Sequence, residues 1–416
     1  MSGVDNDDWL TRSIAQHRLQ HQIVVERTAS NAVLLLLRNV DFVESAASCA
    51  ILTRIAAECS VSECVVYNCR FGHRVVPPAV RDAFARLAEA AHLRALRLSV
   101  TVAGTLVNQF LRSIMAQDTL HSIAFADTLF ASRTLETMAT WLQRTSALHE
   151  LHLINVQSAT PWVTNPLLTA LRSVSSLTSL SFSRTTLHNG GMITLAGHLQ
   201  HQHESSPLRT NLRHIDLGHT AISGVAIGVI STVLCDYSAL CDVSLAHNNR
   251  HTRVTMQAAD GIARLIQNAR HLTRLDLSDI PFETQHLASI FSALRRNSTL
   301  ICVDLSVPAV SPTLSVRNDS AHLSALAVRR LIDVIDSNRC QQLHSLLLDN
   351  RTVDSTACEA LLDALQRNTR LTALTRDAPL CGSIEFRSEI AQLCAEHVLL
   401  RNAIDASARA RQSTTD

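Results

Sequence analysis

Residues 272–297, LTRLDLSDIPFETQHLASIFSALRRN, contain two hydrophobic periods in succession. The first half has leucine at 272, 275 and 277, and this L-x-x-L-x-L spacing predicts a short strand with one buried face. The second half has apolar residues at the three- and four-residue spacing of an amphipathic helix, namely Leu287, Ile290, Phe291 and Leu294. A strand and helix this short cannot bury their apolar faces alone, so the segment predicts a unit that stacks on copies of itself.

The strand pattern recurs along nearly the whole chain. Clear copies begin at Leu93, Leu120, Leu148, Leu177, Leu212, Leu240, Leu272, Leu300 and Leu343, and a weaker copy begins at Leu371. Two degenerate copies precede them, Ala32-Leu35-Leu37 and Ser62-Val65-Tyr67. Successive copies start 27 to 43 residues apart, most often 28. The chain is therefore predicted to be an α/β solenoid of about twelve repeats over residues 30–380.

This combination resembles the ribonuclease-inhibitor-like type of leucine-rich repeat, similar to the repeats of nucleotide-sensing receptors, Ran GTPase activators and tropomodulins. The resemblance implies a curved horseshoe with a parallel β-sheet on the concave face and helices on the convex face. The chain departs from the family at the asparagine that normally follows the strand. Only Asn248 occupies that position, and Thr101, Thr128, Thr185 and Thr220 stand there in other copies.

The two ends are predicted to cover the open ends of the solenoid core, which would otherwise contact water. Residues 8–27 have the pattern of an amphipathic helix, so 1–29 are expected to form an N-terminal capping helix. Residues 381–404 are expected to form a C-terminal capping helix, and 405–416 a disordered tail.

Composition excludes several function classes. The 37 basic residues are all arginine, and with 36 acidic residues they leave a net charge of +1. That balance and an aromatic content of 4% argue against nucleic-acid binding. Without lysine there is no Schiff-base or P-loop lysine. The missing lysine reflects either a composition that favours arginine codons or selection against ubiquitin acceptor sites.

No catalytic, cofactor or metal motif is present, and no enzyme activity is expected. The sequence has no nucleophile elbow, glycine-rich phosphate loop or HExxH. The eleven cysteines form no CxxC pair, and nothing fixes a metal geometry for His214, Asp216, His219 and His247. An acidic start and short apolar runs predict a cytoplasmic, reduced protein without membrane insertion, with cytoskeletal or ciliary association left open.

The outward positions of the predicted sheet are polar and rich in histidine. The candidate partner-binding residues are His121, His149, His152, Arg184, Arg213, Asp216, His219, His247, Asp276, Asp279 and Asp304. The acidic line from Asp216 to Asp304 favours a basic segment of a protein partner, although a solvated sheet face would also be polar. Insertions near 200–211, 248–256 and 306–322 either shape the rim of this surface or are neutral variations in loop length.

These features predict a non-enzymatic protein–protein interaction scaffold that binds its partner on the concave face and rim loops. Two alternatives remain open. The lysine-free chain would suit a substrate-recognition subunit of a ubiquitin ligase or a translocated effector. The resemblance also implies the possibility of a GTPase-activating regulator of the Ran-activator type.

Overall fold

The chain divides into two compact units, Met1–Leu212 and Arg213–Asp416, in a computed structural model. The structure describes residues 22–27, 33–42, 45–69, 78–89, 93–99, 119–205, 211–249, 254–307, 322–337, 340–375 and 384–412.

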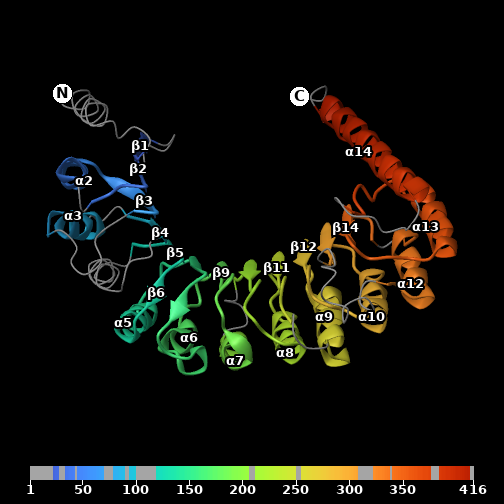
Figure 1. The fold of residues 1–416 in the computed structure, drawn as a ribbon, viewed down its shortest axis with the longest axis horizontal. Coiled ribbons are helices and arrows are strands. Elements are labelled where there is room, and N and C mark those ends of the chain that lie inside the picture. Colours follow the sequence, from blue (N-terminus) through green and yellow to red (C-terminus); the bar gives the residue numbers. More distant parts are fainter. Residues whose placement is uncertain are drawn as a thin grey trace. The chain divides into compact units, whose positions relative to one another are not determined.

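Strands and helices alternate along the first unit (Figure 1). Its main sheet contains, in spatial order, β1 (Ile23–Arg27), β2 (Val33–Arg38), β3 (Val61–Tyr67), β4 (Ala95–Ser99), β5 (Ser122–Ala126), β7 (Glu150–Ile154) and β9 (Ser179–Ser181). All neighbours from β2 onward are parallel. The helices are α2 (Ala46–Glu58), α3 (Pro78–Glu89), α5 (Ser132–Leu142), α6 (Pro166–Leu171) and α7 (His188–Ser205), with the 3-10 turn η1 (Trp162–Thr164). Two short strands, β6 (Leu129–Phe130) and β8 (Gln157–Ser158), form a separate parallel pair.

The second unit repeats the same alternation. Its parallel strands are β10 (His214–Asp216), β11 (Asp242–Ser244), β12 (Arg274–Asp276), β13 (Cys302–Asp304) and β14 (Ser345–Leu347). Its helices are α8 (Gly224–Leu234), α9 (Met256–Asn268), α10 (Thr284–Leu294), α12 (Ala325–Ile335), α13 (Ser355–Arg367) and α14 (Ile384–Gln412). The weak last copy of the motif contributes one bridge, between Ala373 and Ser345.

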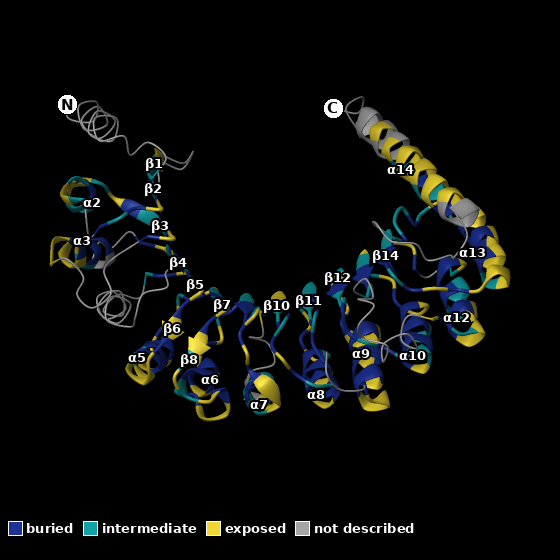
Figure 2. Cartoon of the chain, in the orientation of Figure 1, coloured by how far each residue is buried: buried dark blue, intermediate teal, exposed yellow. Residues whose placement is uncertain are grey.

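In each unit the core lies between the strands on one side and the helices on the other, and the outer helix surfaces are exposed (Figure 2). The motif leucines form this core: Leu272, Leu275 and Leu277 are at most 1% exposed. Burying them removes apolar surface from water, the main favourable contribution to folding. The predicted leucine-rich-repeat solenoid is confirmed, with a strand or bridge at every expected copy.

The predicted register of β3 is wrong by one residue. Val61, Cys64 and Val66 are buried, whereas Tyr67, expected in the core, is 48% exposed. Alternate residues of a strand point to opposite faces, so a shift by one exchanges the whole inward set. The motif in this strand is Val61-x-x-Cys64-x-Val66, with a cysteine at the position that is leucine in most other copies, which made its register hard to recognise from the sequence.

The N-terminal capping helix expected over 1–29 is wrong for its last part, because Ile23–Arg27 forms strand β1. This strand pairs antiparallel with β2, with Val25 opposite Leu35. Two consecutive valines favour a strand, and the pairing protects the edge of β2 that a helix was expected to cover. Residues 1–21 lie outside the described part of the chain.

Helix α14 occupies the segment expected to cap the C-terminal end. His397 on this helix is buried, and its Nδ1 lies 2.8 Å from the carbonyl oxygen of Leu371 in the last repeat. The disordered tail predicted from residue 405 is wrong as far as Gln412, because residues 405–412 contain good helix formers and no glycine or proline. None of the helices in the described ranges, α14 with its 29 residues included, is long and apolar enough to cross a bilayer.

Buried polar side chains bridge successive repeats just after the strands. The Asn248 amide donates to the carbonyl oxygens of Leu217 (2.8 Å) and Leu245 (2.9 Å), and its Oδ1 accepts from Thr220 N (3.0 Å). The Thr185 hydroxyl donates to the carbonyl of Leu153 (2.8 Å). A threonine therefore supplies this inter-repeat bond at Thr185, whereas the Thr128 hydroxyl donates within its own repeat, to the carbonyl oxygen of Ala126 at 2.8 Å. Thr101 lies outside the described residues.

Arg351 occupies the same position after β14, three residues past the last leucine of the motif, Leu348. Its side chain is fully buried, and its Nε donates to the carbonyl oxygen of Leu305 at 2.9 Å. Burial lowers the pKa of Arg351 to about 9, because a guanidinium cation is poorly solvated there.

The expectation of a wholly reduced chain is wrong at Cys358, which is disulfide-bonded. Nine other cysteines in the described ranges are not disulfide-bonded. Cys64 and Cys69 are buried as small apolar side chains, as expected.

Candidate partner-binding surface

Two neighbouring columns of side chains point outward from the sheet of the second unit. Parallel register places His214, Asp242 and Arg274 side by side in one column. The same register aligns Asp216 with Ser244 and Asp276 in the other column. The repeat pattern predicted the second column but not Asp242, although the two positions lie two residues apart in each strand and therefore share a face.

The aspartates of this surface also accept hydrogen bonds from the backbone at the C-terminal ends of their strands. Asp216 Oδ1 accepts a hydrogen bond from Gly218 N at 2.9 Å. Asp276 and Asp304 make the equivalent bond two residues on, to Ser278 N and Ser306 N, each at 3.0 Å. Asp304 is 9% exposed, so most of its carboxylate is inaccessible to a partner. The acidic line therefore has a structural role in addition to the predicted binding role.

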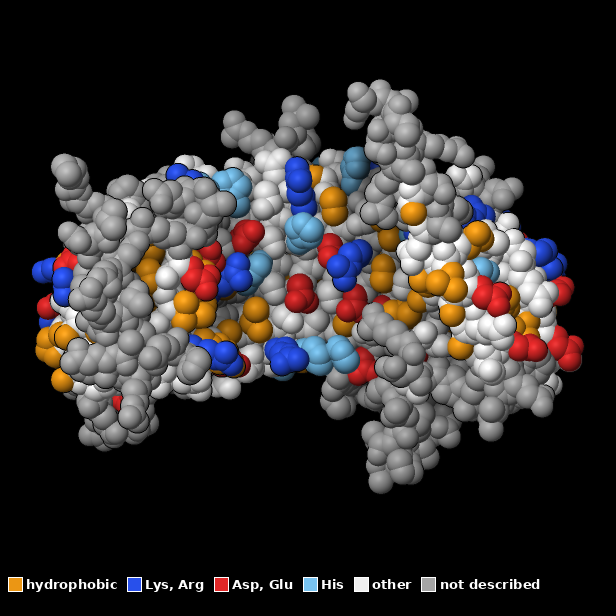
Figure 3. Space-filling model, turned by 90° about the horizontal axis from the view of Figure 1, so that it is seen from above, with side chains coloured by type: hydrophobic (Ala, Val, Ile, Leu, Met, Phe, Trp, Pro, Cys, Tyr) orange, Lys and Arg blue, Asp and Glu red, His pale blue; other side chains and the backbone are white. Residues whose placement is uncertain are grey.

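Asp242 lies among charged side chains of both signs. Burial raises the pKa of the Asp242 carboxyl, and the carboxylates of Asp216 and Asp276 raise it further. His214 and Arg274 oppose this increase, and Arg274 Nε lies 3.7 Å from Asp242 Oδ2. A cation placed on this surface would stabilise the charged carboxylates. Figure 3 shows acidic, basic and histidine side chains close together on the strand side.

A third predicted column consists of turn residues. Arg184, His219, His247 and Asp279 all have positive φ, between 57° and 64°. The same position in other repeats is left-handed too, at Asn39, Asn68, Asp127, Asn155 and Asn350. In the second unit the backbone N–H of the residue at this position donates a hydrogen bond to a carbonyl oxygen of the next repeat. His219 N, for example, donates to the carbonyl oxygen of Ala246 at 2.9 Å. Asn and Asp tolerate this conformation best, which explains why this position is occupied by Asn39, Asn68, Asp127, Asn155, Asp279 and Asn350.

Three of these residues are brought together in the second unit. The imidazole rings of His219 and His247 stack with centroids 3.9 Å apart and planes 15° from parallel. His247 Nδ1 lies 2.7 Å from Asp279 Oδ2, and Asp279 is 8% exposed. His219 and His247 remain half-buried and able to contact a partner.

The remaining candidates form other groups. In the first unit, His121 and His149 stack with ring centroids 5.4 Å apart, and His152 Nε2 lies 2.8 Å from Ser179 Oγ. Arg184 also belongs to the first unit, whereas the exposed Arg213 directly precedes β10 in the second. The eleven predicted residues are therefore divided between the two units.

Part of each insertion lies outside the described residues. These parts are 206–210, 250–253 and 308–321. Within the ranges that the structure describes, no group of three or more His, Cys, Asp or Glu side chains could hold a metal ion.

No family model and no curated protein sequence matches the chain. Among solved structures, an internalin from Listeria monocytogenes str. 4b F2365 is similar at 13% identity over 92% of each chain, with a TM-score of 0.46. TLR13 in its complex with ssRNA13 is similar at 14% identity over 79% of this chain and 37% of that one, with a TM-score of 0.43. Actin-binding site 2 of leiomodin-1 matches at 16% identity over 37% of this chain and 80% of that one, with a TM-score of 0.27. The chain spans little more than a third of TLR13. Similarities at this level carry no information about partner or activity.

Proposed function

We propose that the chain is a non-enzymatic interaction scaffold that binds a basic segment of a protein partner on the sheet face of its second unit. The observation that carries this proposal is that the carboxylates of Asp216, Asp242 and Asp276 lie on the same face of three adjacent strands and are half-buried. Their mutual repulsion is relieved when an arginine or lysine of a partner approaches, which favours a basic ligand over a neutral one.

The repeats are proposed to be of the ribonuclease-inhibitor-like type. Repeats of about 28 residues support this proposal, as do helices of 11 to 13 residues from α8 to α13 in the second unit. Residues in such arrays that bind partners lie on the face formed by the strands, because the helices bury their apolar stripes against the core.

The test removes the three charges and keeps the turn hydrogen bonds. Asn replaces Asp216, Asp242 and Asp276 together, because an amide oxygen still accepts from Gly218 N and Ser278 N. A fluorescein-labelled oligoarginine peptide is titrated by fluorescence anisotropy. We expect about tenfold weaker binding by the triple variant, since charge pairs at an interface contribute on the order of 1.4 kcal/mol or more.

A matched triple variant, Asp236→Asn, Glu359→Gln and Asp363→Asn, removes the same charge from exposed positions away from the strands. It should bind the peptide like the wild-type protein. Equal affinity of both triple variants would refute the assigned surface. Affinity purification with the two variants then identifies the partner that depends on the sheet face.

A further inference from the structure

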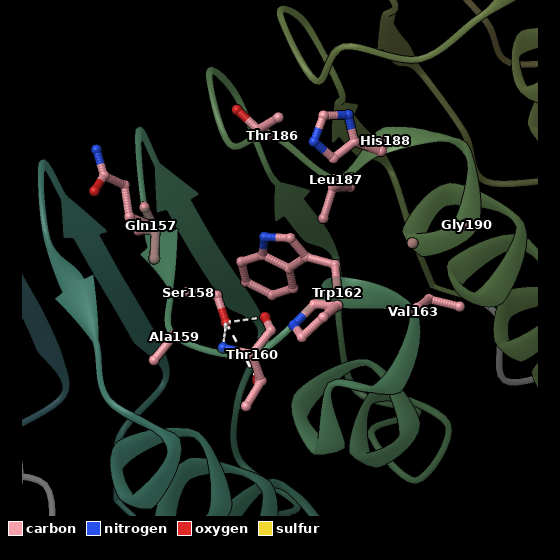
Figure 4. A pocket seen from close by; sticks show the side chains of 13 residues that line it. Gln157, Ser158, Ala159, Thr160, Trp162, Val163, Thr186, Leu187, His188 and Gly190 are labelled. Atoms are coloured by element: carbon pink, nitrogen blue, oxygen red, sulfur yellow. Dashed lines mark hydrogen bonds between the residues drawn. The ribbon is translucent and has the colours of Figure 1, made fainter.

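A groove of about 650 Å³ opens in the first unit. One wall is residues 156–163, which include β8 and η1, and the other is residues 186–191, which lead into α7. In Figure 4 the Trp162 ring stands between β8 and the segment carrying Leu187 and His188. The groove thus lies where two successive repeats separate.

The wall formed by β8 has an open strand edge. Gln157 N donates to Thr128 O and Ala159 N donates to Phe130 O, both at 2.9 Å, on the side of β6. Because backbone groups alternate in direction along a strand, the N–H and C=O of Ser158 face the other way, toward the groove. The sheet formed by β6 and β8 contains only these two strands, so this edge of β8 pairs with no other strand of the described chain.

The floor of the groove is apolar. Trp162 and Leu187 are 6% and 1% exposed, and Trp162 is held edge-on against Phe182 with ring centroids 5.7 Å apart. The side chain of Val163 on the wall is exposed. An apolar side chain entering the groove would cover chiefly the exposed side chain of Val163, because Trp162 and Leu187 are already buried. It would gain roughly 25 cal/mol for each Å² of apolar area removed from water.

The charge of the groove favours an anion. Its lining residues include no acidic residue and no arginine, and His188 is the one ionisable side chain among them. His188 also begins the 18-residue helix α7, whose N-terminal end carries a partial positive charge. A carboxylate is therefore favoured at the end of the groove nearest Gly190.

We propose that this groove binds the C-terminus of a partner polypeptide. The terminal residues add as a short strand to the open edge of β8, an apolar side chain packs against Val163, and the terminal carboxylate lies beside His188 at the start of α7. A chain end fits better than an internal acidic segment, because β8 is only two residues long and a continuing chain would have to turn at the helix. Main-chain pairing with a strand edge combined with a side-chain pocket is a general mode of peptide recognition.

The test begins with selection of random peptides that end in a free carboxylate, using the full-length chain as bait. Enriched peptides are synthesised as the acid and as the C-terminal amide. We expect the acid to bind at least about tenfold more tightly than the amide, because a hydrogen-bonded charge contributes on the order of 1.5 kcal/mol or more. Peptides that bind equally well as amides would overturn the proposal, and so would a selection that enriches none.

A matched pair of substitutions assigns the binding to this groove. His188 has φ of 54°, which both Asp and Asn tolerate, so His188→Asp and His188→Asn should fold alike, as circular dichroism and thermal unfolding would show. We expect His188→Asp to weaken binding of the acid about tenfold relative to His188→Asn, because it places a carboxylate next to the ligand. Equal affinity of the two variants would overturn the assignment. The triple Asn variant of Asp216, Asp242 and Asp276 should bind these peptides normally, so this proposal and the proposed function fail independently.

Discussion

Gly261 of α9 lies against the backbone of Gly228 of α8: a Cβ on Gly261 would stand 2.7 Å from the carbonyl oxygen of Gly228 and 3.1 Å from its Cα. The two helices belong to successive repeats and approach each other more closely than any side chain between them would allow. Interiors packed at this density have no space for an added methyl group without displacement of the backbone.

Gly261→Ala is expected to lower the free energy of unfolding by about 1–3 kcal/mol, because the methyl group forces α8 and α9 apart. Urea denaturation followed by circular dichroism measures the change. Gly197→Ala is the control, since nothing lies within 4 Å of a Cβ at that exposed position within α7. Alanine there should raise stability by about 0.5–1 kcal/mol. A Gly261→Ala variant as stable as the wild type would contradict the close packing of the two helices.

Asn248→Ala should be among the most destabilising changes of a single polar residue in the second unit. It removes the acceptor for Thr220 N and the donors to the carbonyls of Leu217 and Leu245, all of them buried. Each buried backbone group left unpaired costs about 1–3 kcal/mol, so we expect a loss of at least about 2 kcal/mol in urea denaturation. Asn268→Ala, at the exposed last residue of α9, provides the comparison and should change stability by less than about 0.5 kcal/mol.

Protonation of His286 is expected to destabilise the second unit in mild acid. His286 is 1% exposed, and its Nδ1 accepts a hydrogen bond from Glu283 N at 3.1 Å, which requires the neutral ring. Burial lowers the pKa of His286, against the opposing charges of Glu283 and Asp260. The unfolded chain therefore binds this proton more readily, and stability falls as the pH drops below the ordinary histidine value of about 6.5.

The measurement is the free energy of unfolding at neutral pH and below pH 6, for the wild type and for His286→Gln. Glutamine keeps an acceptor for Glu283 N but does not titrate in this range. We expect the variant to lose less stability than the wild type on acidification. Identical losses would show that His286 does not contribute to the acid sensitivity.

The thiols of Cys64 and Cys69 should be unreactive in the folded chain. Burial raises the pKa of Cys64 to about 12 and that of Cys69 to about 11, so almost no thiolate is present at neutral pH. Because the thiolate is the nucleophile, alkylation by iodoacetamide should be at least about a hundredfold slower in the native protein than in urea. Peptide mass spectrometry follows each cysteine, with the half-buried Cys241 as the internal comparison. Rapid native labelling of Cys64 would contradict its position in the core of β3.

The candidate surface was only partly predictable. The spacing of the leucines identifies which residues alternate with them, so Asp216 and Asp276 were correctly placed on the outward face. Asp242 was missed because its importance depends on the carboxylates of the two adjacent strands, which are 26 to 34 residues away in the chain. The turn role of Arg184, His219 and His247 was missed for a different reason, since a left-handed conformation at His or Arg has no sequence signal as strong as glycine or asparagine.

The sequence alone determined the length of the repeat and the apolar periods of its strand and helix. It also determined which side chains of nearly every strand point into the core, because burial of an apolar face depends on local periodicity alone. Tertiary structure decided the rest: the strand at Ile23–Arg27, the core position of Cys64 and the groove between β8 and α7. Each of these features depends on which surfaces of one repeat are not covered by the neighbouring repeats. The distance between two repeats is set by how their side chains pack, and the order of residues within either repeat does not determine it.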